Sequence, residues 1–206
     1  MSISFVSQGE QINNYSFNAG TLAEALEQLT RLGPRDGDGH HAAGCDMRAG
    51  IMEGLQTGIV PGSVVQVQAI GWNGNAEITQ AAFRYGFVFT FPDWANIGSL
   101  SQPIQSEWQR YKGCLWVHER GHVQTAMTVL RRYLKQFQDL RINGTGANRQ
   151  TAEEAAQREL RIQVQAVYDL LAYENQQENN RYDQRTRHGR IQGAQLRTRA
   201  PRGSRY

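Results

Sequence analysis

The residues His118-Glu119-Arg120-Gly121-His122 combine two metal ligands and a general base in little more than one helical turn. Side chains four positions apart lie on the same face of an α-helix, so both imidazoles can bind one ion. The carboxylate of Glu119 is rotated from them by about 100° and can hold water. Zinc lowers the pKa of a bound water to about 7, and a glutamate beside it can take the proton as the water attacks a polarised carbonyl. This H-E-x-x-H spacing predicts a hydrolytic zinc site of the metalloprotease kind.

Apolar residues on both sides of the motif predict that its helix is largely buried, which argues against a solvated helix face that carries two histidines by chance. Gly121 lies in the middle of this helix, where glycine costs about 1 kcal/mol relative to alanine. We therefore expect another segment to pass close to the backbone there. Arg120 should point away from the metal. The flanking apolar residues are Cys114, Leu115, Trp116, Val117, Val123, Ala126, Met127, Val129 and Leu130.

The two histidines need a third protein ligand beside them, because a catalytic zinc usually has three protein ligands and one open position. If the next helix packs antiparallel to the motif helix through a loop at 142–150, positions near 172–176 come level with the motif, which favours Glu174. His188 would overshoot by about 15 Å unless that helix breaks, and Asn179-Asn180 offers a place for a break. The residues alone leave this choice open. The downstream candidates are Glu174, Glu178, Asp183 and His188.

The segment from Tyr182 to Gly189 reads Tyr-Asp-Gln-Arg-Thr-Arg-His-Gly. It resembles the Y-D-x-x-T-x-H-G signature of a bacterial family of predicted secreted zinc-dependent proteases, first catalogued as a domain of unknown function, DUF922. The resemblance covers most of residues 15–194, with Phe91-Pro92-Asp93-Trp94 and Trp108 in the same order. It implies a zincin-type metalloprotease that binds Zn²⁺ through the two histidines of the motif.

The same resemblance implies roles for individual residues. Glu119 would be the general base, and His188 rather than Glu174 would join His118 and His122 as the third metal ligand. We therefore predict that the chain leaves a straight helix between Asn179 and His188.

Tyr182 and Asp183 belong to the same signature. Tyr182 could donate its phenol to the developing oxyanion, and Asp183 could orient a ligand imidazole without touching the metal. The alternatives are that Tyr182 only packs against the preceding helix and that Asp183 makes a helix-end or arginine contact.

The order of the expected elements predicts an α+β fold. Together with the resemblance it implies a zincin-like protein with a small, mostly antiparallel sheet and two long helices, the first of which carries the H-E-x-x-H motif. Thr21 and Glu24 form a capping box that opens an earlier helix, which ends at Gly33-Pro34. Residues rich in β-branched and aromatic side chains predict strands at 63–70, 77–83 and 85–91 with a turn at 71–75, and the long helices are expected at about 103–140 and from Thr151 onward.

A chain of 206 residues is long enough for one core, so we predict a single domain over residues 1–194 and a basic tail over 195–206. The net charge is +3, and eight arginines accompany a single aspartate from Arg181 to the C-terminus. Such a tail can contact nucleic acid or another acidic surface. We do not expect a nucleic-acid partner, because no stacking aromatic residues alternate with these arginines. The expected partner is a peptide or protein substrate.

No apolar run reaches the roughly 18 residues that a membrane-spanning helix needs, and the N-terminus lacks the basic and apolar regions of a signal peptide. The family resemblance implies a secreted or periplasmic protein, and a cytoplasmic location is the alternative. Cys45 and Cys114 could form a disulfide in an oxidising compartment or stay as buried thiols.

The leading hypothesis is therefore a zinc-dependent endopeptidase that hydrolyses peptide bonds with metal-activated water. The alternative is a non-catalytic, zinc-stabilised binding module whose basic tail docks on a partner. A fourth protein ligand, such as Asp183 or a glutamate, would then close the metal site.

Overall fold

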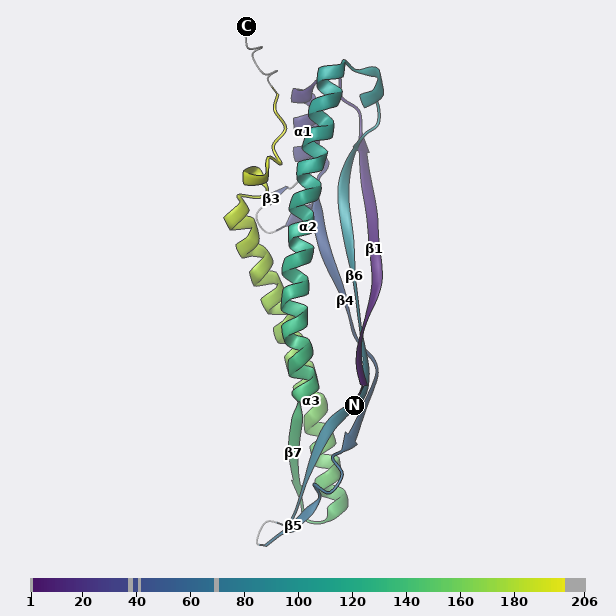
Figure 1. The fold of residues 1–206 in the computed structure, drawn as a ribbon, viewed down its shortest axis with the longest axis vertical. Helices are drawn as coiled ribbons and strands as arrows, with labels where there is room; N and C mark the ends of the chain where they lie inside the picture. Colours follow the sequence, from purple (N-terminus) through teal and green to yellow (C-terminus); the bar gives the residue numbers. More distant parts are fainter. Residues whose placement is uncertain (1, 37–38, 41, 69–70, 199–206) are drawn as a thin grey trace. The chain divides into compact units, whose positions relative to one another are not determined.

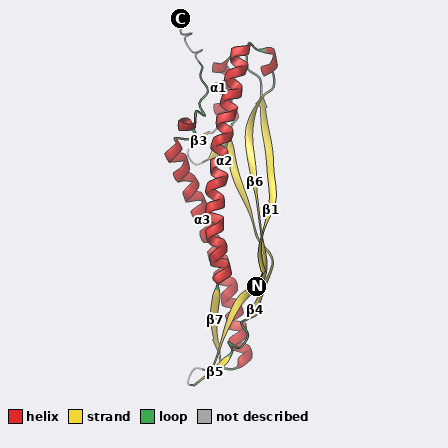
Figure 2. Cartoon of the chain, in the orientation of Figure 1, coloured by secondary structure: helices red, strands yellow, loops and turns green. Residues whose placement is uncertain are grey.

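The structure, a computed structural model, describes residues 2–36, 39–40, 42–68 and 71–198 (Figures 1 and 2). Helices and strands are both present, which confirms the predicted α+β class. In chain order the elements are β1 (Ser2–Phe17), α1 (Leu22–Leu32), β2 (Arg35–Asp36), β3 (Gly39–His40), β4 (Gly44–Ile59), β5 (Val65–Val67), β6 (Gly71–Trp94), the 3₁₀-helix η1 (Ile97–Ser99), α2 (Gln102–Asp139), β7 (Arg141–Gly146), α3 (Arg149–Thr186) and the 3₁₀-helix η2 (Arg190–Gln192).

Strand β6 organises the main sheet. The strand order is β1-β6-β4, and β5 and β7 also pair with β6, while β2 and β3 form a separate two-stranded ribbon. The predicted turn at 71–75 is wrong, because these residues pair antiparallel with β5 and β7. A Cβ on Gly71 would lie only 2.5 Å from the carbonyl oxygen of Gly146. The glycine thus marks a close approach of two strands, which a sequence pattern cannot distinguish from a turn.

Helix α1 begins and ends where the sequence predicts. The backbone N–H of Glu24 donates to the hydroxyl of Thr21 at 3.2 Å, and the Glu24 carboxylate accepts from the N–H of Gly20 at 2.7 Å. Ala25 and Leu29 are its buried residues, and Gly33 follows its last turn.

Helices α2 and α3 each contain 38 residues. The side chain of Asn148 accepts from the N–H of Thr151 at 2.9 Å and so caps the start of α3. Asn179-Asn180 lies inside α3, so the suggested break at that point is wrong. The helix ends at Thr186, and His188 follows with a φ of +50°. The predicted departure from a straight helix before His188 is therefore confirmed.

The chain divides into two compact units. The first contains residues 1–8, 48–86 and 126–178, and the second contains residues 9–47, 87–125 and 179–206. In the first unit, Phe83 of β6 stacks on Phe5 with ring centroids 5.1 Å apart. The buried core of this unit also includes Ile78, Leu130, Phe137, Leu160 and Leu171 from β6, α2 and α3.

The core of the second unit is aromatic. The rings of Trp94 and Trp108 meet edge to face at 5.4 Å, and Phe17 packs 5.8 Å from each of them. The indole N–H of Trp94 donates to the carbonyl oxygen of Ala19 at 3.1 Å. Trp108 lies on α2 ahead of the H-E-x-x-H motif, so this core fixes the part of the helix that leads to it.

Among the described residues, none of the helices carries an apolar stretch of the length that a bilayer requires. Leu196 is buried in the second unit. The predicted domain boundary at residue 194 stays a prediction.

Candidate metal centre

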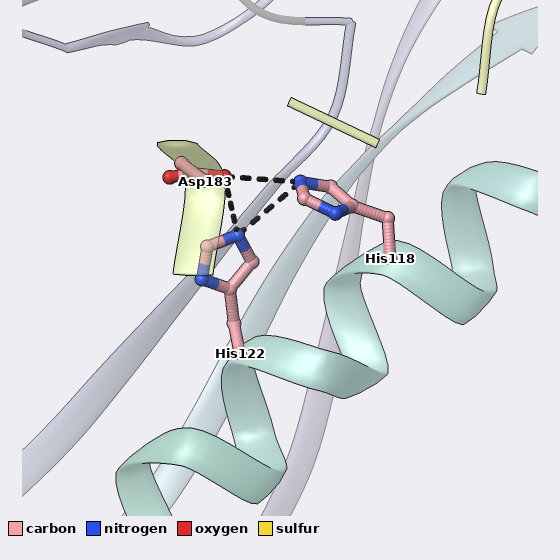
Figure 3. A group of neighbouring side chains, drawn as sticks. All are labelled: His118, His122 and Asp183. Atoms are coloured by element: carbon pink, nitrogen blue, oxygen red, sulfur yellow. Dashed lines mark hydrogen bonds and ion pairs between the residues drawn. The ribbon is translucent and has the colours of Figure 1, made fainter. Parts of the chain in front are cut away.

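Three side chains of the second unit meet in a small cluster: His118 and His122 from α2, and Asp183 from α3 (Figure 3). The two Nε2 atoms are 3.3 Å apart, and Oδ1 of Asp183 lies 3.1 Å and 3.2 Å from them. A tetrahedral zinc with bonds of about 2.0–2.1 Å holds its ligand atoms about 3.3–3.4 Å apart. The three atoms therefore have the spacing of three corners of such a site.

The outer ring nitrogens of both histidines face side-chain oxygens. Nδ1 of His118 lies 3.0 Å from Oε1 of Gln192, and Nδ1 of His122 lies 2.8 Å from Oδ1 of Asn179. An amide oxygen only accepts hydrogen bonds, so each Nδ1 carries a proton. When the rings are neutral, both Nε2 atoms would direct their lone pairs at the centre of the cluster, where a metal would lie.

A closed chain of hydrogen bonds fixes the orientation of the Gln192 amide. Its nitrogen donates to the hydroxyl of Tyr182 at 2.7 Å, and that hydroxyl donates to the carbonyl oxygen of His118 at 3.2 Å. The Gln192 oxygen is thereby left to accept from Nδ1 of His118. Reversing the amide would set a nitrogen against the ring and break this pattern.

Opposing electrostatic effects act on the cluster. Burial alone would lower the pKa of His122, but the hydrogen bond to Asp183 and its negative charge outweigh burial and raise the pKa above its ordinary value. Burial alone would raise the pKa of Asp183, but hydrogen bonds with His118 and His122 outweigh it and hold this pKa well below the usual range. The cluster therefore favours a positive charge at its centre, which either a proton or a metal ion can supply.

A pocket of about 210 Å³ opens onto these ligands, and Glu119 lines it beside them. The Glu119 side chain is buried, with the residue only 3% exposed. It is thus placed where a general base would act on a molecule in the pocket. The other lining residues include Pro34, Arg35, Ala43, Gly44, Cys45, Asp46, Thr90, Asn179 and Asn180.

Gly121 lies directly under Tyr182, which confirms that another segment approaches the motif helix at this glycine. A Cβ on Gly121 would be 1.8 Å from the Tyr182 hydroxyl oxygen. The Tyr182 ring stacks on His118, with centroids 5.3 Å apart, and meets His122 edge to face at 4.9 Å. Tyr182 therefore packs on both histidines and bonds to the helix backbone, and its role as an oxyanion donor stays a prediction.

The structure places His188 at the edge of the cluster. Its Nδ1 is 3.9 Å from Oδ1 of Asp183, and its side chain is 42% exposed. Arg187 and His188 both adopt positive φ angles, of +52° and +50°, which turn the chain after α3. Within the described residues, Asp183 completes the group with ligand spacing, whereas His188 does not. Asp183 is one of the four downstream candidates from the sequence, although the preferred ligand there is His188 and Asp183 has an orienting role.

Glu174 is the candidate third ligand that the expected helix register favours. It forms an ion pair with Arg132 at 2.5 Å and belongs to the first unit. Arg120 points away from the ligands, as expected. It forms a bidentate pair with Glu10, and its guanidinium lies 4.6 Å from the ring centroid of Trp116.

Cys45 and Cys114 are free thiols. Burial raises the pKa of Cys45, and the nearby negative charge of Glu119 raises it further. Cys45 is therefore held as a neutral thiol at the wall of the pocket.

Sequence reasoning missed Asn179 and Gln192 as partners of the histidines. Gln192 lies 74 positions from His118 along the chain, and Asn179 lies 57 positions from His122. Amide side chains are common and follow no ligand spacing, so the sequence held no signal that would select these two.

Comparison of the chain with curated proteins and with solved structures found no match. The family model described as "Bacterial protein of unknown function (DUF922)" matches residues 12–189, which include the H-E-x-x-H motif, Asn179, Asp183 and His188. The chain belongs to this bacterial family, DUF922.

Proposed function

We propose that the chain is a zinc-dependent endopeptidase of the zincin type and that His118, His122 and Asp183 hold the metal. The observation that carries this proposal is the convergence of two Nε2 atoms and one carboxylate oxygen at 3.1–3.3 Å. Two neutral imidazoles and a carboxylate are a ligand set that suits Zn²⁺. The third ligand in this proposal is Asp183 in place of His188, because its oxygen already has the spacing of a ligand.

The ion, when bound, would polarise the scissile carbonyl and lower the pKa of water. Glu119 lines the same pocket and is almost completely buried. Its carboxylate would take the proton of the attacking water and return it to the leaving amine. Few competing solvent molecules reach a carboxylate in such a position, so the proton is retained for the second step.

The substrate would bind as an extended peptide along β4. This strand stands at the end of the order β1-β6-β4, and its first residues, Gly44, Cys45 and Asp46, line the pocket. An extended peptide can add to such an edge through main-chain hydrogen bonds, which do not depend on its sequence. A scissile bond would in this way be brought to the ligands and to Glu119.

The decisive experiment compares Glu119→Gln with the unchanged protein. We expect both to bind one Zn²⁺, while only the unchanged protein hydrolyses fluorescently labelled casein. Glu10→Gln is a matched control, since this surface carboxylate pairs with Arg120 outside the pocket. Full activity in Glu119→Gln would contradict the assignment of the base. The absence of metal in the unchanged protein, after dialysis against Zn²⁺, would contradict the metal site.

A non-catalytic binding module would need His188 as a fourth metal ligand. Its imidazole would have to move onto the metal from a position 3.9 Å from Asp183 and so close the fourth position. X-ray absorption of the zinc-loaded protein separates the two functions, because a catalytic site has two imidazoles, a carboxylate and water, whereas the closed site has three imidazoles. His188→Ala should leave the first spectrum unchanged and remove one imidazole from the second.

A further inference from the structure

The segment after Gln192 lies along the same face of α2 that carries His118. Arg110 and Glu107, which precede His118 on α2, contact residues 193–197 at three points. Nη1 of Arg110 donates to the carbonyl oxygen of Gly193 at 2.8 Å, and Nη2 donates to that of Gln195 at 2.7 Å. The N–H of Arg197 donates to Oε1 of Glu107 at 2.8 Å. We call residues 193–197 the C-terminal strap.

The strap runs antiparallel to α2. Gln192, which precedes the strap, lies at His118, and Arg197 lies at Glu107, which is earlier on the helix. The buried residue Leu196 of the strap adds an apolar anchor.

Glu107 and Arg110 form an ion pair with each other and also bind the strap. Two hydrogen bonds join them, at 2.6 Å and 2.8 Å, with side chains 15% and 27% exposed. Burial alone would raise the pKa of Glu107, but its hydrogen bonds with Arg110 and Arg197 outweigh burial and lower it. Both groups are charged at neutral pH. Glu107 therefore holds the guanidinium of Arg110 in the orientation in which it donates to carbonyl oxygens of the strap.

Two glycines shape the connection between the strap and the metal cluster. Gly189 and Gly193 flank η2 with φ angles of +77° and +84°. A Cβ on Gly193 would lie 3.1 Å from the sulfur of Cys114 and 3.4 Å from Nη1 of Arg110. Any other residue at position 193 would strain this close approach of the strap to α2, because it would combine a positive φ with a tight contact, and Gln192 precedes this point.

We propose that Arg110 and Glu107 are positioning residues for the metal site, which they serve by holding the strap so that Gln192 keeps Nδ1 of His118 as a donor. The inference rests on the metal site proposed above. Its consequence is that metal affinity depends on a charged pair that touches neither the ion nor its ligands. Outer partners of metal-binding histidines typically change affinity by about 10- to 100-fold.

A double-mutant cycle on Zn²⁺ affinity tests this proposal. We expect Gln192→Leu to weaken binding by about 10- to 100-fold, and Arg110→Ala by about tenfold. Because Arg110 acts through Gln192, Arg110→Ala should cause less than about a twofold further loss in the Gln192→Leu background. A merely structural effect would instead be equal in both backgrounds. Arg132→Ala is the matched control, since this arginine of α2 lies in the first unit.

A second variant covers the case in which Arg110→Ala does not fold. Gly193→Ala keeps all charged groups but sets a Cβ against Cys114, so it should displace the strap and lower Zn²⁺ affinity to a similar degree. Amide hydrogen exchange of residues 190–197 should rise in the same variants, with or without metal.

Three results would overturn the proposal. Unchanged Zn²⁺ affinity in both Arg110→Ala and Gly193→Ala would refute it and leave the zinc site standing. An equal loss of Zn²⁺ affinity from Arg110→Ala in the unchanged protein and in Gln192→Leu would also refute it and leave the zinc site standing. No Zn²⁺ binding by the unchanged protein would refute the proposed function and this inference together.

Discussion

Asn179 accepts a hydrogen bond from Nδ1 of His122 at 2.8 Å and precedes Asp183 by one turn of α3. In the proposed metal site, one face of this helix therefore supplies both a ligand oxygen and the support for a ligand from the other helix. This relationship makes Asn179→Leu informative, because leucine has a similar size but cannot accept the hydrogen bond. We expect Zn²⁺ affinity to fall by about 10- to 100-fold, measured by competition with a chromophoric chelator.

The matched variant is Asn179→Asp. Its carboxylate still accepts from Nδ1, so affinity should stay within about tenfold of the unchanged protein or increase. Equal affinities for Asn179→Leu and the unchanged protein would show that His122 needs no partner at this position.

The choice between Asp183 and His188 as third ligand predicts opposite orders of effect. With Asp183 as ligand, Asp183→Ala should weaken Zn²⁺ binding by more than the roughly 100-fold that loss of an outer partner can cause. His188→Ala should weaken it by less than about tenfold, because its ring lies at the edge of the cluster. Isothermal titration at one pH compares the two variants. The reverse order would restore His188 as the ligand.

The contact between Gly121 and Tyr182 predicts a large effect of one methyl group. A Cβ on Gly121 would lie 1.8 Å from the Tyr182 hydroxyl oxygen and 2.1 Å from its Cζ. Gly121→Ala must displace the ring that stacks on His118, so it should destabilise the protein by about 1–3 kcal/mol or more, measured by urea unfolding.

Gly113→Ala in the same helix is the control. Apart from the adjacent backbone of the helix itself, no described atom lies within 4 Å of a Cβ placed there. This substitution should stabilise the protein by about 0.5–1 kcal/mol, because alanine is the better helix former. Similar effects of the two variants would mean that α2 responds only to helix propensity.

The shifted pKa values of His122 and Asp183 predict how the metal-free protein responds to pH. The raised pKa of His122 contributes stability below its ordinary value of about 6.5, and this contribution is lost as pH rises through the raised value. The lowered pKa of Asp183 contributes stability above about 3.9, which is lost as pH falls through the lowered value. The pair therefore stabilises the chelator-treated protein most between about pH 4 and pH 6.5.

Thermal unfolding of chelator-treated protein at about pH 5 and about pH 8 measures this effect, with His122→Gln as the reference that lacks it. Zinc affinity should change in the opposite direction and fall with acidification, because Zn²⁺ and the proton compete for the same Nε2 atom. A stability difference between the unchanged protein and His122→Gln that does not vary with pH would contradict the assignment.

Local spacing made part of the site predictable. His118 and His122 are one turn apart on a helix, so their meeting follows from the geometry of α2 alone. The glycine at 121 was also informative, because a residue that weakens a helix needs a compensating contact. The capping pattern at Thr21 and Glu24 likewise depends only on neighbours and predicted the start of α1 correctly.

The third residue of the cluster could not be predicted from local sequence patterns. Choosing between Asp183 and His188 requires knowing where α3 ends, and two residues with positive φ set that point. Asn179 was read as a weak helix former, yet its side chain is bonded to His122 inside the helix. Tertiary contacts outweigh a propensity difference of about 0.7 kcal/mol or less.

The support of His118 by a residue 74 positions further along the chain has a consequence for biosynthesis. A ribosome delivers the first two ligands long before it has translated α3 and the turn that follows it. The nascent polypeptide therefore contains only part of the proposed metal site until Asp183 and Gln192 have been translated and have left the ribosome. Under the proposed function, a product that ends before Asp183 would lack part of the metal site and would be inactive.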